Sequence, residues 1–174
     1  MTNVLAIGAG TMGTQIALYC AMGGCRVKIY DVKADMLDAS LANMRKYLKE
    51  LAGLGVFTEP QCEEIMSRVT ATADPHEAGK DADIIFTTNT SSLVPSMYAK
   101  ATGRQEKFAA MHFHPPIWDN RIVDIAPHPK TNPETIQALQ RFARSVGLIP
   151  ITLEKEHHSY VFNTMLNGLL GAAM

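Results

Sequence analysis

The first 31 residues constrain the fold more than any other part of the chain. A short apolar run, Val4–Ile7, ends at a glycine-rich stretch, residues 8–13 with the sequence GAGTMG, and an apolar helical pattern follows up to Met22. Residues 26–30 then alternate with a period of two, and the alternation ends at Asp31. A strand, a helix and a second strand in so short a stretch predict a β-α-β unit with parallel strands.

The glycine-rich stretch has the form G-x-G-x-x-G, and its place between a strand and a helix indicates a dinucleotide-binding turn. Gly8 permits a tight turn, Gly10 lets the backbone approach a pyrophosphate, and Gly13 lets the helix pack closely on the strand. Asp31 would accept hydrogen bonds from the ribose hydroxyls and repel a 2′-phosphate, which predicts NAD, while Lys33 keeps NADP open as the alternative. The residues expected to contact the cofactor here are Gly8, Ala9, Gly10, Thr11, Met12, Gly13 and Asp31.

The rest of the chain continues the alternation of strand and helix. Apolar residues at helical spacing predict a long helix from Ala34 to Leu51, and a capping-box pattern at residues 58–61 opens the next helix. We expect an α/β fold with a Rossmann-type, doubly wound and mostly parallel sheet. The remaining strands are expected at residues 69–72, 83–86, a stretch ending at 112, 122–125 and 149–153, and the remaining helices at 75–80, 94–101, 133–146 and 160–174.

One expected strand has an unusual continuation. Residues 83–86 run directly into Thr87-Thr88-Asn89, whereas two neighbouring parallel strands need a connection of about a dozen residues. Either one strand takes the place of two, or a crossover is missing at the junction 86/87. We expect an NAD-binding domain over residues 1–156 and the start of a helical C-terminal domain over residues 157–174.

Composition excludes some partners and suggests a compartment. The net charge of −1 gives no field that would attract nucleic acid or an anionic membrane. No window offers the ~18 apolar residues that a membrane span needs. The three cysteines form no CxxC pair, which favours a reducing compartment. We therefore expect a cytoplasmic protein without nucleic-acid or membrane partners.

Four motifs occur in an order that carries a family resemblance: GAGTMG at 8–13, NTSSL at 89–93, HF at 112–113 and VFN at 161–163. Together they resemble the L-3-hydroxyacyl-CoA dehydrogenase family. Residues 123–129 and 155–158 are also similar to its lambda-crystallin and L-gulonate dehydrogenase branch. The resemblance implies NAD-dependent oxidation of a short-chain L-3-hydroxyacyl-CoA, such as 3-hydroxybutyryl-CoA, in fatty acid or butanoate metabolism. It also implies a homodimer formed through a C-terminal domain beyond Met174.

The resemblance assigns roles to five residues. His112 matches the histidine that takes the hydroxyl proton, and Asp124 stands twelve residues later, where the family has a glutamate that orients the histidine. Because aspartate is one methylene shorter, we expect a small backbone adjustment there. Ser91 matches the serine that binds the substrate oxygen, Asn163 matches the asparagine near the reacting carbonyl, and Asn89 lies beside the nicotinamide in the resemblance.

Other features depart from the family or leave alternatives open. Pro115 replaces an asparagine, and the family's Glu and Lys cofactor contacts in the crossover have no counterpart here. The alternatives are a dehydrogenase of a free hydroxy acid, of the L-gulonate or carnitine type, and a non-catalytic, crystallin-like NAD-binding protein. No metal site is expected, and we expect the other histidines to lie on the surface or in loops: His76, His114, His128, His157 and His158.

Overall fold

The structure is a computed structural model of the chain, and it describes residues 2–80 and 86–172. Strands and helices alternate along these residues, and the paired strands are mostly parallel, which confirms the expected α/β fold of Rossmann type. The expected strand at 83–86 lies, apart from residue 86, outside the described residues. The chain divides into two compact units, Met1–Asp83 with Pro115–Asp119, and Ile84–His114 with Asn120–Met174.

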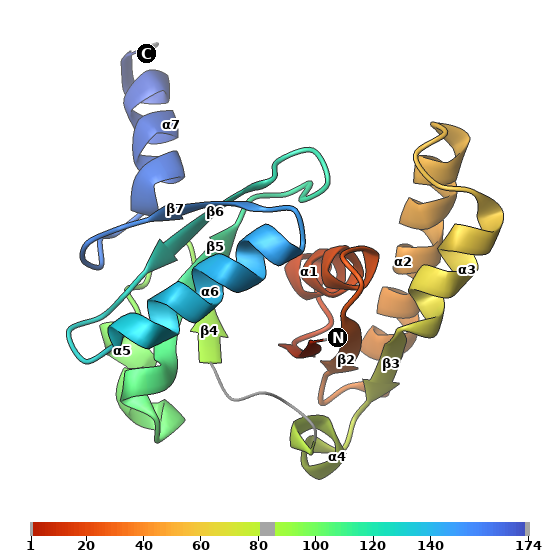
Figure 1. The fold of residues 1–174 in the computed structure, drawn as a ribbon, viewed down its shortest axis with the longest axis horizontal. Helices are drawn as coiled ribbons and strands as arrows, with labels where there is room; N and C mark the ends of the chain where they lie inside the picture. The colour runs from red at the N-terminus through yellow and green to blue at the C-terminus, as the bar shows by residue number, and fades with distance from the viewer. Residues whose placement is uncertain (1, 81–85, 173–174) are drawn as a thin grey trace. The chain divides into compact units, whose positions relative to one another are not determined.

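The first unit is built on three parallel strands in the order β1-β2-β3 (Figure 1), which are β1 (Asn3–Ile7), β2 (Arg26–Tyr30) and β3 (Val69–Thr72). Helix α1 (Thr11–Met22) packs on β1 and β2. Val27 and Ile29 on β2 are almost fully buried, because alternate residues of a strand point to the same face of the sheet. The expected β-α-β unit is therefore present, and its turn lies at the carboxyl end of β1.

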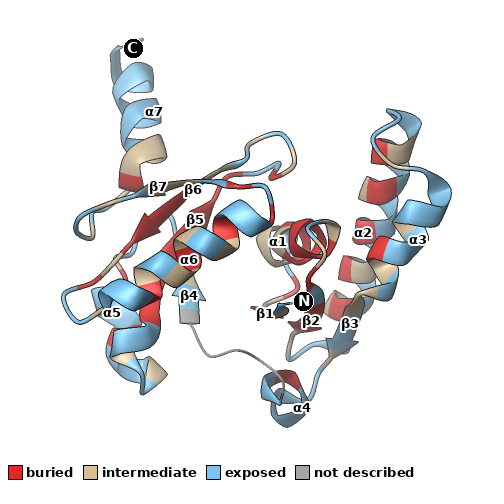
Figure 2. Cartoon of the chain, viewed as in Figure 1, coloured by how far each residue is buried: buried red, intermediate tan, exposed pale blue. Residues whose placement is uncertain are grey.

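Two further helices of this unit follow the apolar patterns in the sequence. Helix α2 (Ala34–Gly53) buries a stripe that includes Leu37, Met44, Leu48 and Leu51 (Figure 2). Helix α3 (Glu59–Ser67) begins with the expected capping box, in which the Thr58 amide donates to Gln61 Oε1 at 2.8 Å. A short helix, α4 (Pro75–Gly79), follows β3.

The second unit contains a four-stranded sheet in the order β4-β5-β6-β7, with β4 (Phe86–Thr88), β5 (Phe108–Phe113), β6 (Ile122–Ala126) and β7 (Ile149–Thr152). All its neighbouring pairs are parallel except β5 and β6. Every residue of β5 is buried, and helix α6 (Pro133–Ser145) packs across β5, β6 and β7 (Figure 2). The centre of this sheet is therefore the core of the unit, and it carries two of the predicted site residues.

The remaining helices of the second unit flank this sheet. The helix expected at 94–101 is shorter in the structure, with α5 covering Ser96–Ala99 and a 3-10 turn covering Lys100–Thr102. The Thr102 hydroxyl donates to the carbonyl of Ala99 at 2.7 Å, which helps to close the turn there. Helix α7 (Tyr160–Ala172) buries its first residue and exposes apolar side chains further on. Within the described part of the chain, no helix has the length and apolar character required to cross a membrane.

Candidate functional site

The glycine-rich turn has the backbone geometry that its sequence predicts. Gly8 has φ of 96°, a conformation that side chains other than glycine rarely adopt. A Cβ atom on Gly13 would lie 1.8 Å from the carbonyl oxygen of Gly8, so only glycine permits this contact between α1 and the turn. A Cβ on Gly10 would meet nothing within 4 Å, so the backbone there faces open space. These three observations match the roles that we expected of the three glycines.

Asp31 closes the turn from the end of β2. The Ala9 amide donates to Asp31 Oδ2 at 2.8 Å, and the Lys33 amide donates to Oδ1 at 3.0 Å. These hydrogen bonds, that from Ala9 above all, lower the pKa of the Asp31 carboxyl, which keeps it ionised. Thr11 and Met12 form the first turn of α1, which contains no acidic residue. An open backbone, a helix N-terminus and an ionised carboxylate fit a dinucleotide, and we refer to residues 8–13 with Asp31 as the dinucleotide turn.

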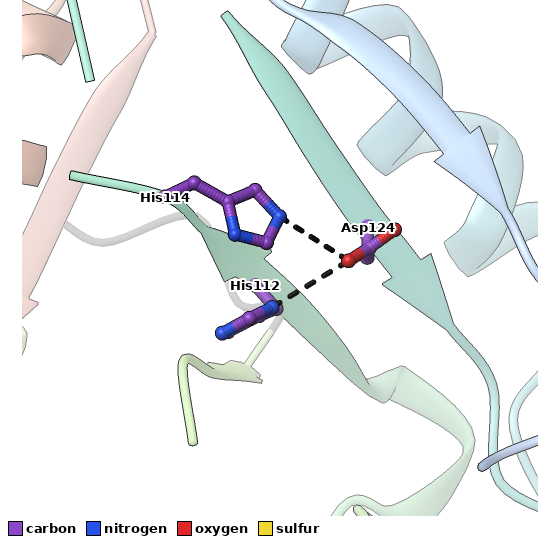
Figure 3. A group of neighbouring side chains, drawn as sticks. All are labelled: His112, His114 and Asp124. Carbon is purple, nitrogen blue, oxygen red and sulfur yellow. Dashed lines mark hydrogen bonds and ion pairs between the residues drawn. The ribbon is translucent and has the colours of Figure 1, made fainter. Parts of the chain in front are cut away.

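A second group of polar side chains lies in the other unit, where β5 pairs with β6. The antiparallel register places His112 directly opposite Asp124. His112 Nδ1 lies 3.5 Å from Asp124 Oδ2, and His112 Nε2 lies 3.3 Å from Ser91 Oγ (Figure 3 shows the two strand residues). The two residues are thus in register across the strand pair, and the contact between their side chains is longer than an ordinary hydrogen bond.

His114 corrects the sequence analysis, which placed it among the surface or loop histidines. It follows the end of β5 but is only 4% exposed, and its Nε2 lies 3.2 Å from Asp124 Oδ2 (Figure 3). Residues two apart on a strand share a face, so the spacing of His112 and His114 was a signal that both could reach the same partner. His128 is also buried, and its Nε2 donates to the carbonyl of Gln105 at 2.8 Å.

The charge of Asp124 depends on these two histidines. Burial alone would raise the pKa of this carboxyl, but the contacts with His112 and His114 outweigh burial and hold the pKa at about 2. Within the described residues, Asp124 Oδ1 and His112 Nδ1 have no hydrogen-bond partner at ordinary distance. Asp124 is therefore an ionised carboxylate in the core, and we refer to Ser91, His112, His114 and Asp124 as the histidine group.

Helix α7 and the segment before it cover this group. Tyr160 stacks on His112 with ring centroids 4.9 Å apart, a contact for which we found no signal in the sequence. Asn163 is half-buried on α7, three residues after Tyr160. Asn89 lies beyond β4, and its Oδ1 accepts a hydrogen bond from the Phe113 amide at 2.8 Å. The side chain of Asn89 thus links the end of β4 to the end of β5 through this hydrogen bond.

Three hydrogen bonds attach the segment before α7 to the loop that carries Ser91. Glu156 Oε2 accepts from the Ser96 amide at 2.9 Å, and His158 Nδ1 lies 3.0 Å from the Ser92 carbonyl oxygen. The Tyr160 hydroxyl donates to the Leu93 carbonyl at 3.4 Å. Ser91 is therefore held near His112 from two sides, by β4 and by residues 156–160.

The histidine group also contains the donor set of a metal site. In the described part of the chain, His112, His114 and Asp124 are the group that could hold a cation, with ligand atoms within 4.8 Å of one another. Two imidazole nitrogens and a carboxylate oxygen are ligands that Zn²⁺ accepts. In the hydrogen-bonded arrangement, however, both nitrogens point at Asp124 Oδ2, so a metal ion would compete with these contacts. The sequence analysis expected no metal because it found no metal-ligand spacing.

The first unit is thus of the dinucleotide-binding class. A comparison with family models gives a match to the NAD-binding domain of 3-hydroxyacyl-CoA dehydrogenase over residues 3–86 and 79–157. The chain belongs to this family, and NAD is its cofactor. The two matched stretches overlap at residues 79–86, around the place where the sequence analysis found a strand without its crossover.

Individual relatives agree with the family. Lambda-crystallin of Oryctolagus cuniculus is 24% identical over 98% of this chain, and the mitochondrial hydroxyacyl-coenzyme A dehydrogenase of Sus scrofa is 26% identical over 94%. The chain spans 62% of the length of each of these relatives. The lambda-crystallin alignment extends over 199 positions, 25 more than the 174 residues of the chain, so this relative has residues without a counterpart here.

A solved structure gives a closer match. A diketoreductase, described as acting on dicarbonyl compounds, has a TM-score of 0.93 and 32% identity to this chain. The match covers 99% of this chain and 71% of the diketoreductase chain. The similarity therefore extends over both units of the structure.

Proposed function

We propose that the protein is an NAD-dependent dehydrogenase that oxidises the hydroxyl of a short-chain L-3-hydroxyacyl-CoA to the 3-ketoacyl-CoA. The observation that carries the proposal is the arrangement at His112, with Nε2 at 3.3 Å from Ser91 Oγ and Nδ1 facing Asp124. This arrangement suits a general base that acts on a hydroxyl held by a serine.

The chemistry follows from the hydrogens on the two His112 nitrogens. An ionised carboxylate only accepts hydrogen bonds, so we place the hydrogen of the neutral ring on Nδ1, which faces Asp124, and Nε2 is then an acceptor for the Ser91 hydroxyl or for a substrate hydroxyl in its place. Nε2 takes the proton of the substrate hydroxyl, and the carboxylate stabilises the imidazolium that results. NAD would supply the hydride acceptor for this reaction: the carbon that bears the hydroxyl would lose a hydride and the oxygen its proton, so that the alcohol would become a ketone.

Three other residues have proposed positioning roles. Ser91 Oγ holds the substrate oxygen within reach of His112 Nε2. Asn163 lies on α7 beyond Tyr160, and we place it near the reacting carbonyl. Asn89, whose Oδ1 already binds the Phe113 amide, would present its amide nitrogen to the nicotinamide. In the first unit, we propose that Asp31 and the open backbone at Gly10 bind the ribose and the pyrophosphate of NAD.

The experiment is a measurement of NADH absorbance with the purified protein, NAD and a series of L-3-hydroxyacyl-CoA esters. We expect NADH to form with a short-chain ester and the rate to fall steeply in the variant His112→Ala. No signal with any 3-hydroxyacyl-CoA, or an undiminished rate in His112→Ala, would overturn the proposal.

A second candidate substrate is supported by the diketoreductase, whose substrates are described as dicarbonyl compounds. The same base and cofactor could oxidise a free hydroxy acid, such as L-gulonate or carnitine, or act on a similar small molecule. A comparison of kcat/KM for the CoA ester and for the free acid separates the two. Faster turnover of the free acid would favour this second candidate.

The non-catalytic alternative has support from lambda-crystallin among the relatives and from Pro115, which replaces a polar family residue. It predicts that NAD binds in a calorimetric titration but that no substrate of either class is turned over. Ser91, His112 and Asp124 argue against it, because a protein that only binds NAD has no need of a base facing a serine.

A further inference from the structure

His114 is a buried histidine to which the proposed function assigns no role. It follows β5 two residues after His112, and the two rings meet edge to face with centroids 4.5 Å apart. On its other side, His114 packs against Phe162 of α7 at 4.2 Å. The ring is therefore packed between His112 and α7, and the residue is only 4% exposed.

The contact of His114 with Asp124 is shorter than that of His112. His114 Nε2 lies 3.2 Å from Asp124 Oδ2, whereas His112 Nδ1 lies 3.5 Å from the same oxygen. The first distance is within hydrogen-bonding range and the second is longer than an ordinary hydrogen bond. One carboxylate oxygen therefore serves two imidazoles, and His114 is the nearer of the two.

This sharing sets the tautomers of both rings. Because the ionised carboxylate offers no hydrogen, the hydrogen bond to Asp124 requires the hydrogen of His114 on Nε2, and the geometry favours the hydrogen of His112 on Nδ1, the nitrogen that faces the same oxygen. The other titratable group against His112 is Tyr160, and burial, with smaller contributions from Asp124 and Glu156, raises the pKa of its phenol to about 12. The phenol of Tyr160 is thus uncharged near neutral pH, so it adds no charge beside Asp124 and the two histidines.

We propose that His114 is a positioning residue that, by donating its Nε2 hydrogen to Asp124 Oδ2, holds the carboxylate in place facing His112. The shorter aspartate side chain leaves the His112 contact long, and the hydrogen bond from His114 keeps the carboxylate from turning away. The catalytic consequence rests on the proposed function, but the contact itself can be tested without turnover.

The test uses nitrogen-15 HMBC spectra of the histidine rings, recorded on the full chain in the presence of EDTA. We expect His112 to carry its hydrogen on Nδ1 and His114 to carry its hydrogen on Nε2. A carbon-13 titration of the Asp124 carboxyl in the variant His114→Phe, which keeps a ring against Phe162, should show the pKa of Asp124 raised by about one unit. His114→Gln, whose amide can donate, should reverse part of this rise.

Exposed His76 supplies the matched control, since His76→Phe makes the same substitution on α4 and should leave the Asp124 titration unchanged. In the enzyme assay, His114→Phe should lower kcat about tenfold with little change in KM, because ground-state binding is kept while alignment is lost. If His114→Phe does not fold, the tautomers of the unmodified protein still decide the question.

Three results would overturn the proposal: the Nδ1–H tautomer at His114, an Asp124 titration that His114→Phe leaves unmoved, or stoichiometric zinc in the purified protein. The last would make the group a metal site. The predicted tautomers together with no turnover of any substrate would instead overturn the proposed function and leave the role of His114 intact.

Discussion

The dinucleotide turn and the histidine group are built in different ways. The turn lies within residues 8–31 and depends on backbone: a positive φ at Gly8, a close approach at Gly13 and an amide of Ala9 bound by Asp31. The histidine group depends on side chains from three separate segments, since Ser91 follows β4, His112 and His114 belong to β5 and its end, and Asp124 lies on β6.

Because of this difference, we expect the two sites to respond to different kinds of substitution. A turn made of backbone contacts is defined by which residues can adopt its conformation, so steric substitutions should damage it most. A group made of side-chain contacts depends on strand register and on charge, so it should respond most to removal of a polar atom or to pH. Variants of each site should therefore differ in whether they change stability, cofactor affinity or turnover.

The largest effect is expected from His112→Ala. Loss of the general base should lower kcat/KM about a thousandfold, while NAD affinity, which depends on the dinucleotide turn, should stay within about twofold. Steady-state NADH formation and calorimetric NAD titration measure the two quantities. The exposed histidine in His76→Ala is the control and should change neither. A parallel loss of NAD affinity in His112→Ala would contradict the independence of the two sites.

Gly13→Ala should produce the next largest effect. The added Cβ would lie 1.8 Å from the Gly8 carbonyl oxygen, so the turn must shift. We expect the free energy of unfolding to fall by about 3 kcal/mol and NAD affinity to be lost. Gly10→Ala is the matched control, because its Cβ meets no protein atom within 4 Å and should weaken NAD binding without lowering stability. Chemical denaturation and calorimetry give both readouts, and equal destabilisation by the two variants would refute the steric explanation.

The histidine group should make stability depend on pH at the acid end. The pKa of Asp124 is about 2 in the folded chain against an ordinary value of 3.8. A lowered pKa means that the stabilisation is fully present above about pH 4 and is lost as the pH falls through about 2. Since each unit of pKa shift corresponds to ~1.4 kcal/mol, Asp124 should contribute about 2 kcal/mol to the free energy of unfolding. Urea denaturation at a series of pH values between pH 2 and pH 5 measures this contribution.

In Asp124→Asn the dependence of the free energy of unfolding on pH between pH 2 and pH 5 should largely disappear, because the amide does not titrate. If the free energy of unfolding of Asp124→Asn still falls as steeply with decreasing pH, other carboxyl groups cause the loss of stability in acid. Removal of exposed Asp35 at the start of α2, as Asp35→Asn, is the control and should leave this pH dependence as it is.

The smallest effect is expected from Asp31→Ala. Loss of the ribose contact should weaken NAD binding about tenfold, the size of one hydrogen bond to a charged group, and should narrow the preference for NAD over NADP. Competition calorimetry with the two nucleotides measures both changes. Asp35→Ala removes the same charge nearby without a role in the turn and should alter neither affinity. If the ratio of the affinities for NAD and NADP is unchanged in Asp31→Ala, Asp31 is not the residue that selects NAD over NADP.

Most of the fold could be predicted from the sequence because its signals are local. Periodicity predicted the strands and helices of the described residues except β4, which covers Phe86–Thr88 where a strand at 83–86 was expected. The glycines predicted the turn, since φ at Gly8 and the space at Gly13 depend on a few adjacent residues. At α5 the local pattern predicted too long a helix, because the chain continues after Ala99 as a 3-10 turn over Lys100–Thr102. The contact between His112 and Asp124 was predicted from the family resemblance and not from periodicity.

The backbone of the dinucleotide turn could thus be predicted from the sequence, because the positive φ at Gly8 and the close approach at Gly13 arise within one β-α-β unit. Only the tertiary structure decided which side chains surround Asp124. Its distances to His112 and His114, and the cover of Tyr160, depend on the register of β5 with β6 and on the packing of α7. These are contacts between segments far apart in the chain: the spacing of His112 and His114 indicates a shared face, but the register of β5 with β6 decides which residue lies opposite them.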